Sequence, residues 1–433
     1  MSAGKPALQK PLASYYLVAV STGLLLSIGF VMVLSASSVR AYSTYGNAYT
    51  IAIKQGIFLG IGLPALWVAS RIPVRAWRAL GMPLLLGAIA LLVLVLVPGV
   101  GRNVDGATRW IALPGNFNLQ PSELAKLGIV LWGADLLVRK RKLLGDWKHL
   151  LIPIVPVVGV VAVLVMLEPD MGTTIVVMSI LMTLLWVVGA PARVFAGLLT
   201  AALTIGVLLA VTEPYRFQRL VNFADPCSSG QRLEGGYQAC QGLQALGAGG
   251  WLGLGLGASR EKWAGGLPNP YTDYVYAIVG EELGLMGTLT VLLLFATLTF
   301  AGVRIAKRTT DPFSRLAAAG ITIWITAQAL VNIGTVVGMV PITGIPLPLI
   351  SFGGSALIPT LVGIGMLLSF ARAEPGAAQA LAAQQGRLRR LVSRPAATPV
   401  SVPPQRTRRP ASHPPVRPAA RPAPARRPVA RRR

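Results

Sequence analysis

A single carboxylate, Asp273, stands where a polar loop gives way to an apolar helix. Pro268 and Pro270 cannot sit inside a helix, and Thr272 is a competent N-cap. The apolar run that follows is long enough to span a bilayer, so the pattern predicts that Asp273 lies in the first turn of a membrane helix, at the membrane surface. A carboxylate there can act as a general base. It can equally be a partner of the helix dipole, and both interpretations stay open.

Below Asp273 the predicted helix carries a face of small residues. Ala277, Gly280, Gly284 and Gly287 follow it at helical spacing. Such a seam without side chains admits either a neighbouring helix or a lipid chain. Packing against a helix is the simpler interpretation, although it needs no charge at the mouth of the seam.

A second group of charged residues precedes another apolar run. Pro121 fits the first helical position, so Glu123 and Lys126 should share one helix face near the outer membrane surface. Ion pairs inside a spanning segment are expensive and usually functional, although a purely structural pair remains the alternative. Arg109 and Trp110 come shortly before. They suit an anionic lipid headgroup, or equally an interfacial anchor.

Two adjacent acids, Glu281 and Glu282, should lie about 12 Å below Asp273 along the helix axis. Buried acids need partners, and we expect these to be Gln328 and Asn332, which are four residues apart on one face of a later span.

Three irregular segments fall between the predicted spans. The turn at 168–171 holds two acids, which cap the next helix or bind a divalent cation. The glycine-rich stretch 247–257 lacks the strand and the GKS/GKT sequence of a nucleotide site, so we interpret it as a cover over the functional site. The broken segment 338–355, which contains Ser351, requires protein or a polar cavity around it.

The composition sets the class of protein. Hydrophobic residues make up 53% of the 433 residues and charged residues 13%, and the mean hydropathy is +0.61. These values exclude a soluble globule of this length and predict an all-α polytopic membrane protein. Runs of spanning length predict ten transmembrane helices, near residues 14–36, 51–70, 78–99, 121–138, 151–167, 172–190, 194–213, 274–303, 316–340 and 349–371.

The cations give the orientation. They collect on one side of the spans, for example at 139–142 and 304–315, and the positive-inside rule makes that side cytoplasmic. Both termini are then cytoplasmic, and a large extracytoplasmic loop, 214–273, joins helices seven and eight. Cys227 and Cys240 lie in this loop, where an oxidising compartment permits a disulfide, with two free thiols as the alternative.

The end of the chain differs from the rest. Residues 373–433 hold fourteen arginines and one acid, Glu374, which is about half of the net charge of +25. This Pro/Ala/Arg-rich segment has too little apolar content to fold. We therefore divide the chain into a membrane domain, 1–375, and a disordered cytoplasmic tail, 376–433, which suits acidic proteins or anionic lipids. We expect no nucleic-acid partner.

Several motifs, in their order and spacing, resemble the SEDS family (shape, elongation, division and sporulation). They are GATRWI (106–111), QPSELAK (120–126), EPDMGTT (168–174), GYQACQ (236–241), LPNPYTDYVYAIVGEELG (267–284) and NIGTVVGMVPITGIPLPLISFGGS (332–355). The resemblance covers about residues 14–372. The stretch 328–332 and the long tail are more similar to the division (FtsW-like) branch than to the elongation (RodA-like) branch.

The resemblance implies a membrane glycosyltransferase that polymerises lipid II into peptidoglycan during septal wall synthesis. It implies a class B penicillin-binding protein as partner, with other divisome proteins. Asp273 matches the essential outer-loop aspartate of the family. The candidate substrate-binding residues are Arg109, Trp110, Glu123, Lys126, Lys262 and Ser351. Relatives often carry Glu where Asn269 stands, so no second acid is assigned there.

The proposed chemistry needs no nucleotide. Lipid pyrophosphate carries its own leaving group, so Asp273 acting as general base on the 4-hydroxyl of the acceptor sugar would suffice. Cations, or a divalent ion such as Mg²⁺ or Mn²⁺, would stabilise the departing pyrophosphate. Two alternatives stay open: a lipid II flippase that uses the broken segment as its pathway, and a divisome scaffold anchored in the membrane.

Overall fold

The computed structural model describes residues 12–104, 107–114, 117–143, 146–212, 226–227, 236–263, 265–377 and 379–380. Contacts along the chain divide it into two compact units, Met1–Gln384 and Gln385–Arg433. Only the first contains described residues, and the predicted tail lies almost entirely outside them. The described helices longer than one turn are α1 (Ala13–Tyr45), α2 (Thr50–Ala69), α3 (Val74–Val95), α4 (Pro121–Arg139), α5 (Trp147–Leu151), α6 (Ile154–Leu167), α7 (Met171–Val188), α8 (Ala192–Thr212), α10 (Tyr237–Gly249), α11 (Val275–Arg308), α12 (Pro312–Val336) and α13 (Gly354–Arg372).

Eight of the described helical segments are long and apolar enough to cross a membrane, which confirms the helical, multi-pass class. The other two predicted spans coincide with α4 and α8. Helix α4 is not among the eight because it carries too many charged residues for an apolar span: Glu123, Lys126, Asp135 and Arg139. In α8 the described apolar part is shorter, Ala192–Thr204.

Helix α12 forms the centre of the helical unit. It packs against α4, α7 and α11, and 78% of its most apolar stretch is buried inside the protein. Asp311 caps its start by accepting a hydrogen bond from the Ser314 backbone N–H at 2.8 Å, directly before Pro312 at the first helical position. A helix apolar on all sides is expected at such a buried position.

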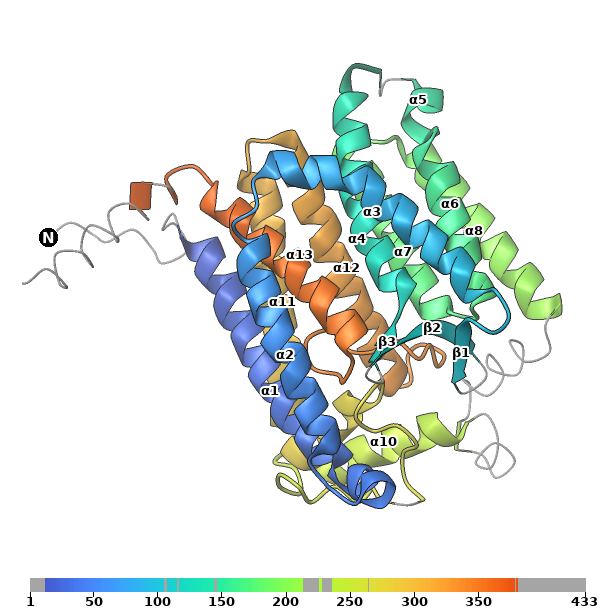
Figure 1. Ribbon diagram of the computed structural model, residues 1–433, viewed down its shortest axis with the longest axis vertical. Helices are drawn as coiled ribbons and strands as arrows, with labels where there is room; N and C mark the ends of the chain where they lie inside the picture. Colours follow the sequence, from blue (N-terminus) through green and yellow to red (C-terminus); the bar gives the residue numbers. More distant parts are fainter. Residues whose placement is uncertain are drawn as a thin grey trace, which may run out of the picture. The chain divides into compact units, whose positions relative to one another are not determined.

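A small sheet that the sequence did not suggest precedes α4. Strands β1 (Gly101–Val104), β2 (Ala107–Leu113) and β3 (Phe117–Leu119) form an antiparallel meander in the order β1-β2-β3. The sheet and α10 lie towards the end of the helices where α1 finishes and α11 begins (Figure 1). Asp273 directly precedes α11, so this is the end that carries the acid.

Helix α11 starts later than predicted and is broken. Its first residue is Val275, so Asp273 lies in the turn before the helix and not in its first turn. The Thr272 hydroxyl donates to the Asn269 carbonyl at 3.0 Å and caps no helix. Further along, Gly284 has φ 67° and ψ −164°, a conformation open essentially to glycine, which interrupts the helix.

The glycine-rich segment fills this break. Leu254 N–H donates to Glu281 O at 2.9 Å, and Gly255 N–H donates to Glu282 O at 3.0 Å. In return, Leu285 N–H donates to Gly250 O at 2.9 Å. Non-helical backbone near a membrane must find its hydrogen bonds within the protein, and here the loop and the interrupted helix supply them to each other.

Candidate functional site

The turn that carries Asp273 is held from several sides. The Thr272 hydroxyl shares its single proton between the Asn269 carbonyl and Asp273 Oδ1, which lies 2.9 Å away, and the carboxylate is half-buried. Asn332 Nδ2 on α12 donates to the main-chain oxygen of Asp273 at 2.7 Å. Arg40, near the end of α1, donates to the Pro268 carbonyl. Because its backbone is anchored to both helices, the carboxylate projects from a rigid support while remaining accessible.

The broken segment between α12 and α13 completes this support. Ser351 Oγ donates to the Thr272 carbonyl and accepts the Leu347 N–H at 2.8 Å. Phe352 N–H donates to Tyr271 O at 2.9 Å, and the two rings meet edge to face with centroids 5.7 Å apart. Ser351 thus contacts the acid-bearing turn, and its hydroxyl is engaged with protein backbone on both sides.

The predicted partners of the two buried acids are wrong. Gln328 and Asn332 contact neither Glu281 nor Glu282; Gln328 Nε2 donates to Pro346 O at 3.1 Å, and Asn332 Nδ2 to Ile345 O at 2.8 Å. Helical spacing correctly places the two amides on one face of α12. That face meets the broken segment.

The acids are satisfied by the loop that precedes α11 and by α1. Glu281 accepts from Ser259 Oγ at 2.6 Å and from the Arg260 N–H at 2.7 Å. Glu282 accepts from Ser35 Oγ at 2.6 Å and pairs with Lys262 Nζ at 3.2 Å. These side chains fasten the loop to the first half of α11. The ion pair with Glu282 explains how the Lys262 side chain can be buried, with only 6% of the residue exposed.

The predicted pair on α4 exists and is fully buried. Lys126 Nζ lies 2.8 Å from Glu123 Oε1 and donates to Gln328 Oε1 at 2.7 Å. Trp324 Nε1 donates to the same amide oxygen at 3.1 Å, and the Lys126 ammonium lies 5.2 Å from the Trp324 ring centroid. The other oxygen of Glu123 has no hydrogen-bond partner within the described residues.

Arg109 and Trp110 take opposite faces of β2, as neighbours on a strand must. Arg109 is buried and binds the turn between α6 and α7, donating through Nε to Glu168 O at 3.1 Å and also to Pro169 O. Its Nη1 lies 3.9 Å from Asp170 Oδ2. Trp110 is half-buried.

The turn at 168–170 contains two acids with different roles. Asp170 caps α7 by accepting the Thr173 N–H at 3.0 Å and also accepts from Gln120 Nε2 at 3.3 Å. Burial, with Asp170 adding repulsion, raises the pKa of Glu168 to about 8. Glu168 is therefore mainly neutral at pH 7, and Arg109 faces one nearby negative charge in this turn, not two.

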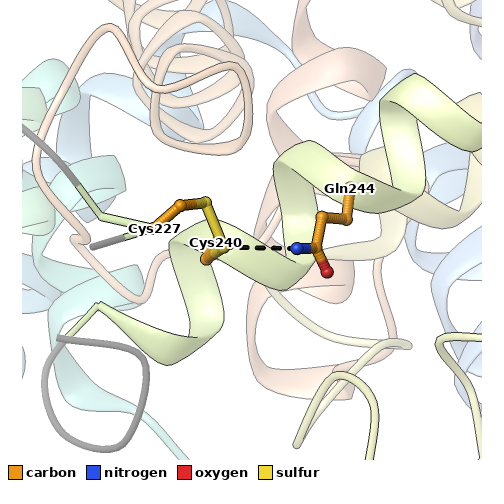
Figure 2. Close-up of a disulfide and its surroundings, with 3 residues drawn as sticks. All are labelled: Cys227, Cys240 and Gln244. Atoms are coloured by element: carbon orange, nitrogen blue, oxygen red, sulfur yellow. Dashed lines mark hydrogen bonds between the residues drawn. A yellow bond between two sulfur atoms is a disulfide. The ribbon is translucent and has the colours of Figure 1, made fainter. Parts of the chain in front are cut away.

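The segment between α8 and α11 contains a disulfide. Cys227 and Cys240 are bonded, with Cα atoms 5.1 Å apart and a sequence separation of 13 (Figure 2). Cys240 lies in α10, where Gln244 Nε2 approaches its sulfur at 3.6 Å. Of the alternatives left open by the sequence, the structure contains the paired one.

No group of three His, Cys, Asp or Glu side chains that could hold a metal ion occurs among the described residues. In particular, Asp170 is committed to capping α7, and Glu168 holds a proton at neutral pH. The described part of the chain therefore offers no ligand set of its own for a divalent cation.

Helix α12 organises the candidate site. Its Asn332 holds the acid-bearing turn, its Gln328 holds the buried pair on α4, and both amides also bind the broken segment. Lys262 belongs to the separate cluster around Glu282, and Arg109 to the turn at 168–170. Sequence reasoning missed this role of α12, although the spacing of the two amides was its signal.

Together, the fold and the site define a polytopic membrane protein that presents a supported carboxylate at one end of its helical unit. The family described as "Cell cycle protein", which groups FtsW, RodA and SpoVE, matches residues 15–375. The chain belongs to this family.

Similar proteins cover most of the chain. A "Probable peptidoglycan glycosyltransferase FtsW" of Mycobacterium tuberculosis is 41% identical, over 92% of this chain and 75% of its own. "Stage V sporulation protein E" of Bacillus subtilis is 38% identical, over 82% and 96%. A structure titled "Structural coordination of polymerization and crosslinking by a peptidoglycan synthase complex" superposes with a TM-score of 0.68 at 28% identity, over 82% and 96%. RodA of Thermus thermophilus gives a TM-score of 0.61 at 27% identity, over 83% and 96%.

Proposed function

We propose that this protein is a peptidoglycan glycosyltransferase that polymerises lipid II at the outer face of the cytoplasmic membrane during septal wall synthesis. Relatives that carry the glycosyltransferase name cover nearly the whole chain, which supports the activity. The observation that carries the mechanism is the half-buried carboxylate of Asp273 on a turn anchored to α1, α12 and the broken segment. A general base needs both this fixed position and this access.

In the proposed reaction Asp273 accepts the proton of the 4-hydroxyl of the acceptor sugar as that oxygen attacks the anomeric carbon of the donor. The bond from that carbon to the pyrophosphate oxygen breaks, and lipid pyrophosphate leaves with the electron pair. A single displacement inverts the anomeric carbon, in contrast to retaining hydrolases, where a second carboxylate acts as nucleophile. Thr272 would orient the carboxylate through its bond to Oδ1, which measures 2.9 Å.

The leaving pyrophosphate needs cations, and we assign this role first to Arg109. Lys126 is paired with Glu123 at 2.8 Å and Lys262 with Glu282 at 3.2 Å, so their charges are already compensated. The only acid that pairs with Arg109 within the described residues is Asp170, at 3.9 Å. Arg109 therefore keeps the largest uncompensated charge of the three. We assign Lys126, Glu123, Lys262 and Ser351 to shaping the site, and Trp110 to contact with the substrate lipid.

A divalent cation such as Mg²⁺ or Mn²⁺ would bring further charge to the pyrophosphate. Because the described residues form no ligand set for such an ion, its other ligands would be oxygens of the substrate.

The membrane topology follows from the same proposal. We propose that α4 and α8 also cross the membrane, which makes ten spans with both termini cytoplasmic and the loop 214–273 outside. The four charged residues of α4 are tolerated because Glu123 pairs with Lys126, and Asp135 pairs with Arg78 at 2.8 Å and Arg139 at 2.6 Å.

A class B penicillin-binding protein at the septum would be the partner. Other divisome proteins and anionic membrane lipids would bind the cytoplasmic tail.

The deciding experiment is polymerisation of labelled lipid II by purified protein together with its transpeptidase partner, with and without Mn²⁺. We expect Asp273→Ala and Asp273→Asn to reduce polymer formation by about 10²–10⁴-fold. Asp146→Ala is the matched control, because Asp146 is an exposed acid that caps α5.

A polymerisation rate in Asp273→Ala within a few-fold of wild type would refute the proposal. If the same variant still moved the lipid II headgroup across vesicle membranes and the wild type made no polymer, the flippase alternative would replace it.

A further inference from the structure

A cavity of about 520 Å³ lies between α7, α11 and α12, away from the acid-bearing turn. Its lining comes from the last turns of α7, the last third of α11 and the first half of α12, which all lie at the end of these helices opposite Asp273. Lys307 and Arg315 both line this cavity. It shares no residue with the candidate functional site.

The walls of the cavity are apolar even though several threonines line it. Thr299 Oγ1 donates to Phe295 O at 2.8 Å, and Thr322 Oγ1 donates to Ala318 O at 2.7 Å. Thr299 Oγ1 also forms a hydrogen bond with Thr326 Oγ1 at 2.8 Å. These hydroxyls are therefore satisfied by protein groups, which leaves their methyl groups for an occupant. Val303 and Ala319 line the same space. Such a wall favours a hydrocarbon chain over a polar solute.

The length of the cavity matches one leaflet of a membrane. From Lys307 to Thr299 is about 12 Å along α11, and from Arg315 to Thr326 is about 16 Å along α12. Half of the hydrocarbon core of a bilayer is about 15 Å. An acyl chain that entered beside the two cations would end near the middle of the membrane.

The two cations at one end of the cavity are available to a ligand. In the described part of the chain neither Lys307 nor Arg315 forms an ion pair, whereas the neighbouring Arg308 pairs with Glu374 at 3.1 Å. The nearest acid in sequence, Asp311, is occupied in capping α12 through Ser314. Among the described residues the Arg315 guanidinium donates a single, long hydrogen bond, 3.4 Å, to Thr309 O.

Helix α8 contacts one residue of the cavity wall, Trp186, but its described residues do not line the cavity itself. Its Phe195 instead meets Trp186 edge to face, with ring centroids 5.7 Å apart. No residue of α8 is among those that line the cavity in the described structure.

We propose that this cavity binds one anionic phospholipid of the cytoplasmic leaflet. The phosphate binds Lys307 and Arg315, and one acyl chain lies along Val303, Ala319 and Thr322. Basic pockets between membrane helices on the cytoplasmic side are suited to such headgroups. The inference requires that these helices cross a membrane in the orientation given above, and it does not depend on the glycosyltransferase activity.

The test uses purified full-length protein, stripped of lipid in a neutral detergent. It is then incubated with dioleoyl phosphatidylglycerol or dioleoyl phosphatidylcholine, and bound lipid is counted by native mass spectrometry. We expect one phosphatidylglycerol to be retained preferentially, and Lys307→Gln/Arg315→Gln to weaken its retention roughly 10- to 30-fold. Arg141→Gln/Lys142→Gln removes two exposed cations outside the cavity and should change nothing.

A second variant tests the acyl-chain part of the site. Val303→Trp fills the cavity from its 41% exposed rim and should reduce phosphatidylglycerol retention without changing the charge. Equal retention of the two lipids, or equal losses in the two charge variants, would overturn the proposal. Displacement of the lipid by glycerol phosphate at equal concentration would do the same, because the site would then bind a free anion.

One further outcome would assign the cavity to α8. Leu199→Cys on α8 and Ile323→Cys on α12 would form a disulfide in native membranes if α8 closed over the cavity. Complete cross-linking there would contradict a resident lipid. We expect no cross-link in membranes that contain phosphatidylglycerol.

Discussion

At the scale of single residues, the buried pair on α4 shows how charge is tolerated inside this helical unit. Glu123 and Lys126 are each only 1% exposed, and Gln328 accepts a second hydrogen bond from the ammonium. A pair of this kind adds little net stability over apolar residues, but removing one partner leaves a buried charge without compensation. The two residues are therefore needed together, although their ion pair adds little to the stability of the protein.

We expect Lys126→Met to destabilise the protein by about 3–5 kcal/mol, because the carboxylate of Glu123 is left unpaired. The double variant Glu123→Gln/Lys126→Met should recover most of this loss. The measurement is the apparent unfolding midpoint in detergent. A double variant no more stable than the single one would contradict the compensation argument.

Glu168 gives the protein a pH dependence. The carboxyl pKa is about 8 in the folded protein and about 4.5 when unfolded, so the folded state keeps a proton that the unfolded state loses. Stability is fully present below about pH 4.5 and falls as the pH rises towards 8, by on the order of 5 kcal/mol in total.

We expect Glu168→Gln, which cannot ionise, to flatten this fall. The unfolding midpoint of wild type and variant should be compared between pH 5 and pH 8.5, with Asp146→Asn as the control on an exposed acid. An identical decline in wild type and Glu168→Gln would assign the pH dependence to another group.

At the scale of elements, the break in α11 and the glycine-rich loop form one unit. A Cβ on Gly284 would lie 2.4 Å from Gly253 N, and a Cβ on Gly253 would lie 2.2 Å from Glu282 O. Both glycines also have positive φ. The close approach of the two backbones therefore requires the absence of side chains at both positions.

We expect Gly284→Ala to separate the loop from α11 and to reduce polymerisation at least tenfold, with a lower unfolding midpoint. The matched control is Gly247→Ala on α10, where a Cβ would meet nothing within 4 Å. That change should be neutral or slightly stabilising, because alanine is the better helix former. A wild-type polymerisation rate in Gly284→Ala would show that activity does not require the close contact between the loop and α11.

The sequence predicted the secondary-structure elements better than the contacts between them. The apolar runs fell on helices, Pro121 begins α4 as expected, and Glu123 pairs with Lys126. The break at Gly284 was missed because hydropathy continues across it and reports preference for lipid, not backbone geometry. The partners of Glu281 were missed because residue spacing defines a helix face without telling which element that face meets.

At the scale of the whole molecule, the end of the membrane unit is fastened to α11. Glu374 is 2% exposed and pairs with Arg308 at 3.1 Å, and burial raises its pKa. The first compact unit of the chain extends to Gln384. The charged tail predicted from the sequence should therefore be removable only beyond this point.

We expect deletion of 385–433 to leave lipid II polymerisation in vitro unchanged and to impair recruitment to the septum, because the removed segment carries the basic charge but no part of the candidate site. A truncation after Ala373, which also removes Glu374, should lower stability by leaving Arg308 unpaired. Loss of polymerisation in the shorter deletion would show that the tail does more than recruit.

The pairing between the glycine-rich loop and the interrupted helix also bears on biosynthesis. The loop precedes α11 in the chain, so it leaves the ribosome before the helix that it must complete. When the first half of α11 is made, its partner segment has already been synthesised and can supply the hydrogen bonds that the break exposes. The chain order thus spares the nascent helix a period in lipid with bare peptide groups, and a circular permutant with the loop after α11 would lose that protection.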